Sequence, residues 1–386
     1  MSKKYDYVSI ISAAVFLVSL LLPDFIHYKE TRISISQPLS AQEYLGGFYW
    51  LCLAAALILL LLAVVKKKDK RWNFISGICA SLTLVLVVFL SAISVNAHTV
   101  DGIGRFSFGV GFIIAVIAIY SVMLKCQQYI TNPRLKLIVS ILAWVIIGVM
   151  LVQGTLNGYS VMQEYIAQKA KFAYNVIEHI KLSFSALLVA VVIGVPWGYS
   201  CYKNSTVDKI TIVGLSITET MPQLALFAII RIPFIYLTQA FPVLIEWGFG
   251  GYGFAPAFTA LFLYALYLII HNVRAAFHSI DPALLENAVA MGMKSKEVFW
   301  KVQLPSALPY IMNGIRIAMI STIVGASLSS FVGAAGLGVY IVNGINALAI
   351  DLQLLGIIPI FIITVIADLI MGKFIKALLP NGDKNK

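Results

Sequence analysis

Residues 286–305 read ENAVAMGMKSKEVFWKVQLP, and the interpretation of the surrounding chain depends on this polar segment. It carries five charged side chains, an internal glycine and a final proline, in a chain that is 60% hydrophobic. Apolar runs at 256–270 and 311–331 flank it. A membrane-spanning helix needs roughly 20 residues, so the flanking runs with their neighbouring residues are candidate spans. The segment is therefore predicted to be a connection at a membrane surface.

The composition of the chain predicts a helical membrane protein. Charged residues make up 12% of its 386 residues, whereas soluble domains carry about 25%. The apolar residues form continuous blocks instead of the alternating segments of a transmembrane β-barrel. The net charge of +11 fits basic residues that flank membrane spans better than it fits nucleic-acid binding. We therefore expect an all-α polytopic membrane protein.

Ten apolar runs are candidate membrane spans. They are residues 8–22, 47–65, 74–95, 108–124, 137–152, 182–201, 210–230, 256–270, 311–331 and 354–371. With the N-terminus inside, 20 of the 28 Lys and Arg residues fall on the cytoplasmic side, 7 on the outer side and Arg316 within a span. This excess predicts ten spans with both termini in the cytoplasm. The first run has no A-x-A-like cleavage site, so we interpret it as an uncleaved span.

Polar residues 153–180 divide the chain into two halves. Five spans with few polar residues and short basic connections precede them, and five spans with internal prolines and charges follow. Function is therefore expected in the second half. Apolar residues at helical spacing over 161–180 predict an amphipathic helix on the outer surface. It is either a plain surface helix or a docking surface for an outside partner.

Residues 281–305 have the signals of two short helices joined by a glycine turn. Asp281 is a capping carboxylate, and Pro282 stands at the first helical position. Gly292 stands where a helix commonly ends in a left-handed residue. Ser295 is expected to cap a second short helix that continues through Lys301. The segment is therefore predicted to fold rather than to form an irregular loop.

Two further expectations concern the end of this segment and its surface. Leu304-Pro305 is expected to stop the second helix, because proline cannot continue the helical hydrogen-bond ladder. Its apolar residues include Leu284, Leu285, Ala288, Met291, Val298, Phe299 and Trp300. A loop that only shields its own backbone is one interpretation of them. So many apolar residues beside water favour a surface for a protein partner.

The spacing within this segment resembles a known family signature. In order along the chain come Glu286-Asn287-Ala288, three residues, Gly292, nine residues and Val302-Gln303-Leu304-Pro305. This order is similar to the EAA loop of ABC importer permeases, which reads E-A-A, three residues, G, nine residues and I-x-L-P. Asn287 stands where the signature has alanine, and Val302 where it has isoleucine.

The resemblance implies a role for the segment. In the family, this loop inserts into a cleft of the ATP-hydrolysing subunit and transmits its closure to the membrane spans. The residues that would carry the ATPase coupling are Glu286, Ala288, Gly292, Leu304 and Pro305. No Walker motif occurs in the chain, so ATP hydrolysis is expected on a separate subunit and the chain itself is not expected to be an enzyme.

The resemblance covers about residues 176–371 and looks like the glycine betaine, choline and carnitine branch of these permeases. Stretches such as LSFSALLVAVVIGVPWG, ITETMPQLALFAII and FVGAAGLGVYIVNGI carry it. It implies a type I permease domain at 176–372, with a coupling loop at 276–310. A five-helix membrane extension at 1–152, an extracytoplasmic connector at 153–175 and a cytoplasmic tail at 373–386 complete the expected layout.

The resemblance also implies partners. Two ABC ATPase subunits, an extracytoplasmic substrate-binding protein and a second copy or a related permease are expected. The complex would lie in the bacterial cytoplasmic membrane and import a small compatible solute.

A second candidate site lies in the predicted span 210–230. It comprises Glu219, Thr220, Met221, Pro222 and Gln223. A charge at the centre of a span costs about 2.5–3.5 kcal/mol, so Glu219 should face a cavity or a partner. Pro222 frees a backbone carbonyl, which is tolerable beside a water-filled path. We expect these residues to line the substrate path; a carboxylate in a closed structural pair, or kept protonated, is the alternative.

The remaining unusual residues favour structural interpretations. Arg316 and Asp368 are expected to form a pair or to extend to the membrane interface. The glycine-rich residues 333–338 predict a tight turn or re-entrant segment rather than a nucleotide loop. Residues 248–256 are either a flexible gate or a contact for the binding protein. The five histidines and four cysteines form no ligand-like pattern, so no catalytic site, metal or cofactor is expected.

Two other functions stay open at this point. One is an ABC permease for an amino acid or another small solute. The other is an ion-coupled secondary transporter that uses Glu219 and Asp368 as ion or proton sites. A membrane-embedded enzyme is disfavoured because no nucleophile stands with a base at recognisable spacing.

Overall fold

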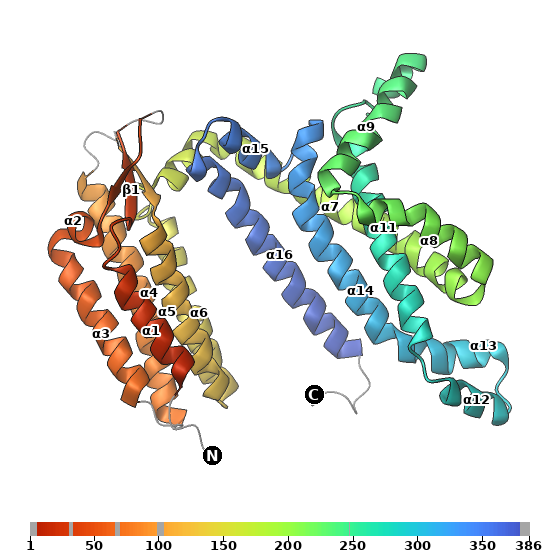
Figure 1. Ribbon diagram of the computed structural model, residues 1–386, viewed down its shortest axis with the longest axis horizontal. Helices are drawn as coiled ribbons and strands as arrows, with labels where there is room; N and C mark the ends of the chain where they lie inside the picture. Colours follow the sequence, from red (N-terminus) through yellow and green to blue (C-terminus); the bar gives the residue numbers. More distant parts are fainter. Residues whose placement is uncertain (1–5, 31–33, 66–69, 99–103, 247, 379–386) are drawn as a thin grey trace. The chain divides into compact units, whose positions relative to one another are not determined.

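Helices dominate the computed structural model of the chain, which describes residues 6–30, 34–65, 70–98, 104–246 and 248–378 (Figure 1). The chain forms two units, Met1–Ala167 and Gln168–Lys386. Within the described residues, nine helices are long and apolar enough to cross a membrane, and Tyr7–Ser19 is a shorter apolar helix. The polytopic helical fold expected from the apolar runs is confirmed.

The first unit is a helical bundle with a small sheet. Its helices are α1 (Tyr7–Ser19), α2 (Ala41–Leu45), α3 (Tyr49–Val65), α4 (Lys70–His98), α5 (Val110–Tyr129) and α6 (Pro133–Val152). Strands β1 (Ile26–Lys29), β2 (Gln37–Leu39) and β3 (Arg105–Phe108) pair antiparallel in the order β2-β1-β3. Ile26 pairs with both Leu39 and Phe108. The sequence analysis did not predict this sheet, because its strands are too short to show a clear alternation.

Buried hydroxyl groups join the helices of this bundle. The Tyr44 hydroxyl donates to the Ser91 carbonyl at 2.6 Å, and the Tyr159 hydroxyl donates to Ser91 Oγ at 2.6 Å. Ser81 Oγ lies 3.1 Å from the Val139 carbonyl, to which it donates. Such bonds connect apolar helices in an environment that offers few other partners.

The second unit is built around long helices. They are α7 (Ser160–Lys203), α8 (Ser205–Thr220), α9 (Gln223–Ala240), α11 (Phe254–His278), α14 (Leu304–Gly325) and α16 (Ile350–Leu378). The shorter ones are α10 (Val243–Glu246), α12 (Pro282–Ala290), α13 (Ser295–Val298) and α15 (Gly338–Asn346). A π-helical turn spans Phe299–Gln303, and a 3₁₀ segment spans Ala326–Val332.

Helix α7 corrects one expectation about the polar middle of the chain. Residues 161–180 are helical as predicted, but they do not form a separate surface helix. They are the first half of α7, a continuous helix of 44 residues. At 1.5 Å per residue it is roughly 66 Å long, more than twice the roughly 30 Å of a hydrocarbon core. A helix of this length extends well beyond one membrane crossing.

The predicted span 210–230 is also corrected. It is not one helix: α8 ends at Thr220, and Pro222 is the N-cap of α9. Proline lacks an N–H and disfavours helical geometry in the residue before it. The chain therefore breaks at Met221-Pro222, in the middle of the predicted span.

Glycines set the spacing between α7, α11 and α14. A methyl group at Gly198 would lie 2.8 Å from Val273 Cβ and 3.0 Å from the Ile270 carbonyl oxygen. At Gly314 it would lie 2.4 Å from Asn272 Cβ. In lipid, helices associate through such close packing, because their apolar side chains gain little by leaving the hydrocarbon.

The close approach at Gly198 gives a stability prediction. Gly198→Ala is expected to lower the free energy of unfolding by about 1–3 kcal/mol, because the added methyl overpacks the contact between α7 and α11. Gly214→Ala is the matched control, since nothing lies within 4 Å of its added methyl. At position 214 the higher helix propensity of alanine should raise the free energy of unfolding by about 0.5–1 kcal/mol. Unfolding of the detergent-solubilised chain measures both free energies. If the two substitutions changed the free energy of unfolding in the same direction, the close packing of α7 against α11 at Gly198 would be contradicted.

Candidate functional site

The 276–310 loop connects α11 to α14 and contains two short helices (Figure 1). Asp281 caps α12: its carboxylate accepts a hydrogen bond from the Ala283 N–H at 2.9 Å, and Pro282 is the first helical residue. Gly292 follows the helix with φ +84, and its N–H donates to the Val289 carbonyl at 2.9 Å. The predicted helix start and glycine turn are confirmed.

The second half of the loop differs from the prediction in two ways. The N-cap of α13 is Lys294 rather than Ser295, and the Glu297 carboxylate accepts from the Lys294 N–H at 3.1 Å. Leu304-Pro305 does not stop the helix, because the π-helical turn leads directly into α14. Proline is tolerated in a first helical turn, and a π turn already departs from the i to i−4 bonding pattern that proline disrupts.

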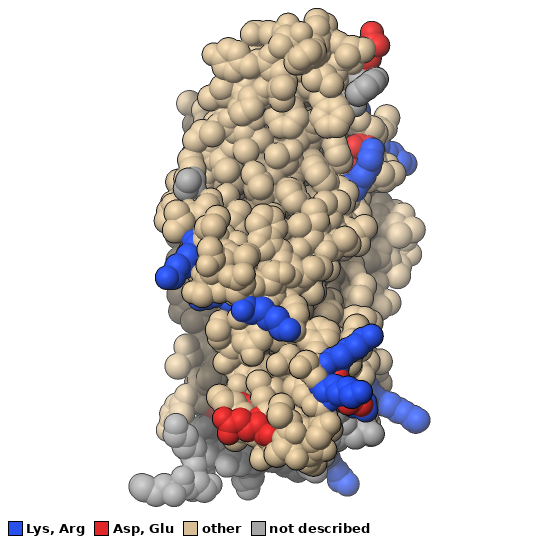
Figure 2. All heavy atoms as spheres, turned by 90° about the vertical axis from the view of Figure 1, so that its right-hand side faces the viewer, with Lys and Arg blue, Asp and Glu red and all other residues tan. Residues whose placement is uncertain are grey.

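The predicted coupling residues divide into buried and exposed positions. Ala288 is buried, as is Val298 of α13, whereas Glu286 and Gly292 are exposed. The exposed large apolar side chains of residues 276–310 are Leu284, Val289, Met291, Trp300 and Tyr310. Figure 2 shows Lys, Arg, Asp and Glu mostly over the lower part of the face it draws, with a broad uncharged area above. Glu286, Lys294 and Lys296 are exposed as well, so the loop presents apolar side chains beside charged ones.

An aromatic cluster of Tyr199, Tyr202, Phe277 and Phe299 joins the loop to α7 and α11. The Tyr199 ring centroid lies 4.8 Å from those of both Phe277 and Phe299. Tyr202 lies 5.5 Å from Phe277. Aromatic pairs at these distances contribute about 0.5–1.5 kcal/mol each beyond the area they bury. The cluster therefore fixes the second half of the loop to two long helices.

The predicted path residues lie together at the break between α8 and α9. Thr220 is the last residue of α8, Met221 and Pro222 form the break, and Gln223 begins α9. The Glu219 side chain lies outside the part of the chain that the structure describes. The Gln223 amide lies close to α14, since a methyl group at Gly325 would be 2.6 Å from Gln223 Nε2.

A buried polar group ties α7 to the glycine-rich turn before α15. Asn175 Oδ1 accepts from the Gly336 N–H at 3.2 Å, and Asn175 Nδ2 donates to the Tyr340 hydroxyl at 3.1 Å. His179 Nε2 lies 3.0 Å from the Ile323 carbonyl oxygen. Asn175 was not predicted from the sequence. The feature that could have identified it is a polar residue on the buried side of a helix.

The glycine-rich residues 333–338 form the predicted tight turn. Gly333 and Gly336 have φ values of +78 and +146, which favour glycine. A methyl group at Gly338 would clash with the Ser327 carbonyl oxygen. These glycines are explained by backbone conformation and close packing.

Two charged residues singled out in the sequence form a pair between α14 and α16. Arg316 donates to both carboxylate oxygens of Asp368, at 2.5 and 2.6 Å. A bidentate pair fixes orientation as well as neutralising charge. The predicted structural pair is confirmed.

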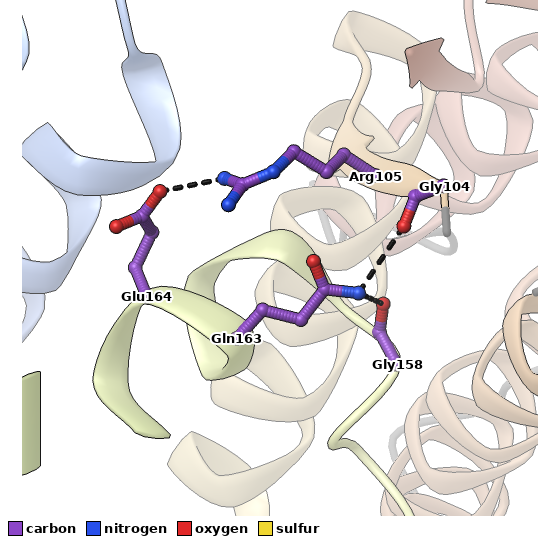
Figure 3. Close-up of polar contacts among 5 residues, drawn as sticks. All are labelled: Gly104, Arg105, Gly158, Gln163 and Glu164. Atoms are coloured by element: carbon purple, nitrogen blue, oxygen red, sulfur yellow. Dashed lines mark hydrogen bonds and ion pairs between the residues drawn. The ribbon is translucent and has the colours of Figure 1, made fainter. Parts of the chain in front are cut away.

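The start of α7 is fixed within the first unit. Arg105 on β3 lies 2.6 Å from the buried Glu164 carboxylate (Figure 3). The Gln163 amide donates to the carbonyls of Gly104 and Gly158, each at 3.2 Å. Within the described residues, no group of three or more His, Cys, Asp or Glu side chains is placed to hold a metal ion.

Two families match the chain. Residues 190–379 match the family described as binding-protein-dependent transport system inner membrane component. Residues 5–162 match the N-terminal domain of the ABC transporter permease YehY.

Curated relatives resemble the second half of the chain. The carnitine transport permease protein OpuCB of Listeria monocytogenes is 34% identical over 205 residues, covering 53% of this chain and 87% of OpuCB. The glycine betaine/carnitine/choline transport system permease protein OpuCD of Bacillus subtilis is 33% identical, covering 58% and 86%. The osmoprotectant import permease protein OsmW of Salmonella typhimurium is 31% identical, covering 53% and 90%.

Among solved structures, an inward-facing conformation of the MetNI methionine ABC transporter is similar to this chain with a TM-score of 0.47 and 20% identity. The match covers 55% of this chain and 99% of that one.

The aromatic cluster gives a prediction for the loop. Phe299→Ala is expected to raise the rate of tryptic cleavage at Lys294 and Lys296 by tenfold or more. Its half-buried ring touches Tyr199 and Phe277, and its loss should cost roughly 2–3 kcal/mol of local stability.

Trp300→Ala is the control. This ring contacts Phe299 edge-to-face, at 5.2 Å between centroids, and is 59% exposed, so its removal should change cleavage less than threefold. Limited proteolysis of the purified chain measures both rates. Equal acceleration in the two variants would show that the cluster does not hold the loop.

Proposed function

The chain belongs to the family of binding-protein-dependent transport system inner membrane components, and we propose that it imports a small compatible solute using ATP hydrolysed by partner subunits. The solute would be of the glycine betaine, carnitine or choline kind. The relatives support this class, since they are named as permeases for carnitine, choline, glycine betaine or osmoprotectants. These solutes share a quaternary ammonium group.

The observation that carries the proposal is the folded 276–310 loop with its exposed apolar side chains. Leu284, Val289 and Met291 lie on or beside α12 and are 45%, 62% and 72% exposed. Contiguous exposed apolar groups rimmed by charges are typical of protein-binding surfaces. The occupant we propose is an ABC ATPase subunit.

Each predicted coupling residue has a place in this proposal. Exposed Glu286 would meet the ATPase, and buried Ala288 would hold α12 against the rest of the loop. Gly292 supplies the left-handed turn between the two helices. Leu304 and Pro305 begin α14, so a displacement of the loop would act directly on a long membrane helix.

The substrate path would pass the break between α8 and α9. Glu219, Thr220, Met221, Pro222 and Gln223 are the residues assigned to it. A helix break within a membrane is tolerated where it lines a cavity, because freed backbone groups need partners. A carboxylate there would attract a quaternary ammonium cation, at an affinity that must stay modest for release.

The complex we propose has further members. Two ATPase subunits, an extracytoplasmic binding protein and a second copy or a related permease would assemble in the bacterial cytoplasmic membrane, with both termini in the cytoplasm. Residues 176–372 would form the type I permease domain, and 373–386 a cytoplasmic tail, of which 379–386 lie outside the described residues. Residues 1–152 would be a membrane extension, and 153–175 an extracytoplasmic connector.

An ion-coupled secondary transporter is the weaker alternative. It would use Glu219 and Asp368 as ion or proton sites. Asp368, however, is held by both guanidinium contacts of Arg316, which disfavours a carboxylate that binds and releases a cation in each cycle. The ATP-driven proposal requires neither residue to bind an ion.

The coupling role predicts the effect of a charge at Gly292. Gly292→Asp is expected to lower ATPase association and ATP-dependent uptake at least tenfold, because the carboxylate would stand within the apolar contact surface. Gly46→Asp is the control: Gly292 and Gly46 both have a positive φ, +84 and +53, and nothing lies within 4 Å of a methyl at either. Copurification and vesicle uptake measure the effect. Normal uptake in Gly292→Asp would refute the coupling role.

The path role predicts the effect of removing the charge at Glu219. Glu219→Gln is expected to slow uptake of quaternary ammonium solutes several-fold, because a neutral amide attracts the cation less strongly. Uptake of glycine betaine, carnitine and choline would be compared at equal amounts of folded complex. Unchanged rates and unchanged selectivity among the three would remove Glu219 from the path.

A further inference from the structure

Two polar contacts hold the beginning of α8. The Asp208 carboxylate lies 2.6 Å from Arg274 Nε of α11, and the two side chains are 16% and 29% exposed. Trp197 Nε1 of α7 donates to Thr211 Oγ1 at 2.9 Å, and Thr211 is buried. Both contacts fall within the first two turns of the helix. They connect α8 to the two helices that also hold the 276–310 loop.

Several described side chains of α8 are exposed in this chain. Ile210 and Val213 are 69% and 71% exposed, and nothing lies within 4 Å of a methyl placed at Gly214. Thr218 is buried near the far end, and its hydroxyl bonds to the Leu215 carbonyl of the same helix. Among the described side chains of α8, Asp208 and Thr211 at its beginning make polar contacts with α11 and α7.

The residues that contact the beginning of α8 lie close to the aromatic cluster along α7 and α11. Arg274 precedes Phe277 by three residues on α11, so both lie on neighbouring turns of one helix face. Trp197 precedes Tyr199 by two residues on α7. A displacement of Phe299 would therefore act on Tyr199 and Phe277, and through α7 and α11 on the two contacts to α8.

The opposite end of α8 reaches the break at Met221-Pro222. A helix transmits displacement along its axis, because its backbone hydrogen bonds keep its length nearly constant. A movement imposed at Asp208 and Thr211 would reach Thr220 and alter the geometry of the break. The connected elements are the loop, the aromatic cluster, the two polar contacts, α8 and the break.

We propose that the Asp208–Arg274 ion pair and the Trp197–Thr211 hydrogen bond transmit movement of the 276–310 loop to α8, and so to the break at Met221-Pro222. These four are positioning residues: they touch neither ATP nor solute. The inference rests on the proposed function, because it assigns the connection between the ATPase contact and the path. It adds that α8 is the helix that moves, with its beginning as the driven end.

The test measures coupling rather than activity alone. The complete complex of permease, ATPase and binding protein is placed in vesicles, and solute uptake and ATP hydrolysis are recorded together. Glycine betaine, carnitine and choline serve as probes. Asp208→Asn and Trp197→Phe are each expected to lower the solute moved per ATP hydrolysed by fivefold or more. The charge exchange Asp208→Arg with Arg274→Asp is expected to restore the ratio to within twofold.

Glu178→Gln is the matched control. It removes an ion pair of 3.3 Å to Lys181 within α7 itself, so it should leave the ratio unchanged. A purely structural effect of Asp208→Asn would lower uptake and hydrolysis in proportion to the amount of folded complex. An unchanged ratio, or a charge exchange that fails to restore it, would overturn the inference.

A second measurement does not depend on the solute. A fluorescent label at Val213→Cys, an exposed position on α8, is expected to change its emission on ATP binding, and this change should disappear when Asp208→Asn is added. A signal that persists in the double variant overturns the inference. If the complex without substitutions shows no ATP-dependent uptake of any probe, the proposed function itself fails, which distinguishes the two results.

Discussion

Hydrocarbon offers no hydrogen-bond partner to a polypeptide backbone, and this constraint governs where helices of this protein begin, end and break. The first helix of the 276–310 loop begins with a side-chain cap at Asp281 and is followed by the left-handed Gly292, and both residues are exposed. By contrast, the break between α8 and α9 lies inside a predicted span, where freed carbonyls need a partner. The same rule thus distinguishes a loop whose backbone groups can bond to water from a helix break whose freed carbonyls would suit the lining of a substrate path.

The hydrocarbon environment also determines how the helices pack against one another. Leucine gains little by moving from lipid to a helix interface, so the helices approach at glycines, where backbone contacts are closest. Gly194 and Gly198 place α7 against Ile269 and Val273 of α11, and Gly314 places α14 against α11. The pairs of helices that flank the loop are therefore the closely packed ones. A tightly packed support lets a loop displacement move whole helices instead of being absorbed by loose side chains.

Local signals in the sequence predicted local structure well. Asp281-Pro282 and Gly292 marked the first loop helix, because capping and left-handed turns depend on the residue itself. The continuation through Leu304-Pro305 could not be predicted in this way, since it depends on a π-helical turn held by Tyr199 and Phe277. The length of α7 was also missed: composition changes near residue 180, but nothing there breaks a helix. For the candidate site, the spacing of residues in the sequence identified the residues of the loop. The contacts that support the loop join segments that are far apart in the sequence, so local signals did not predict them.

Charge placement explains why mechanical coupling suits this chain. Moving a charge into a membrane interior costs about 2.5–3.5 kcal/mol, and Arg316 meets that constraint by pairing with Asp368 across two helices. Arg274 and Asp208 form an ion pair between α11 and α8 through a single close contact, without the bidentate hydrogen bonds of Arg316 and Asp368. Ion pairs of this kind hold helices in register and supply no chemistry of their own. The exposed groups of the loop are apolar side chains with Glu286 and the lysines Lys294, Lys296 and Lys301 beside them. In the function we propose, an ATPase subunit would bind this surface, and the energy for moving the membrane helices would come from that subunit.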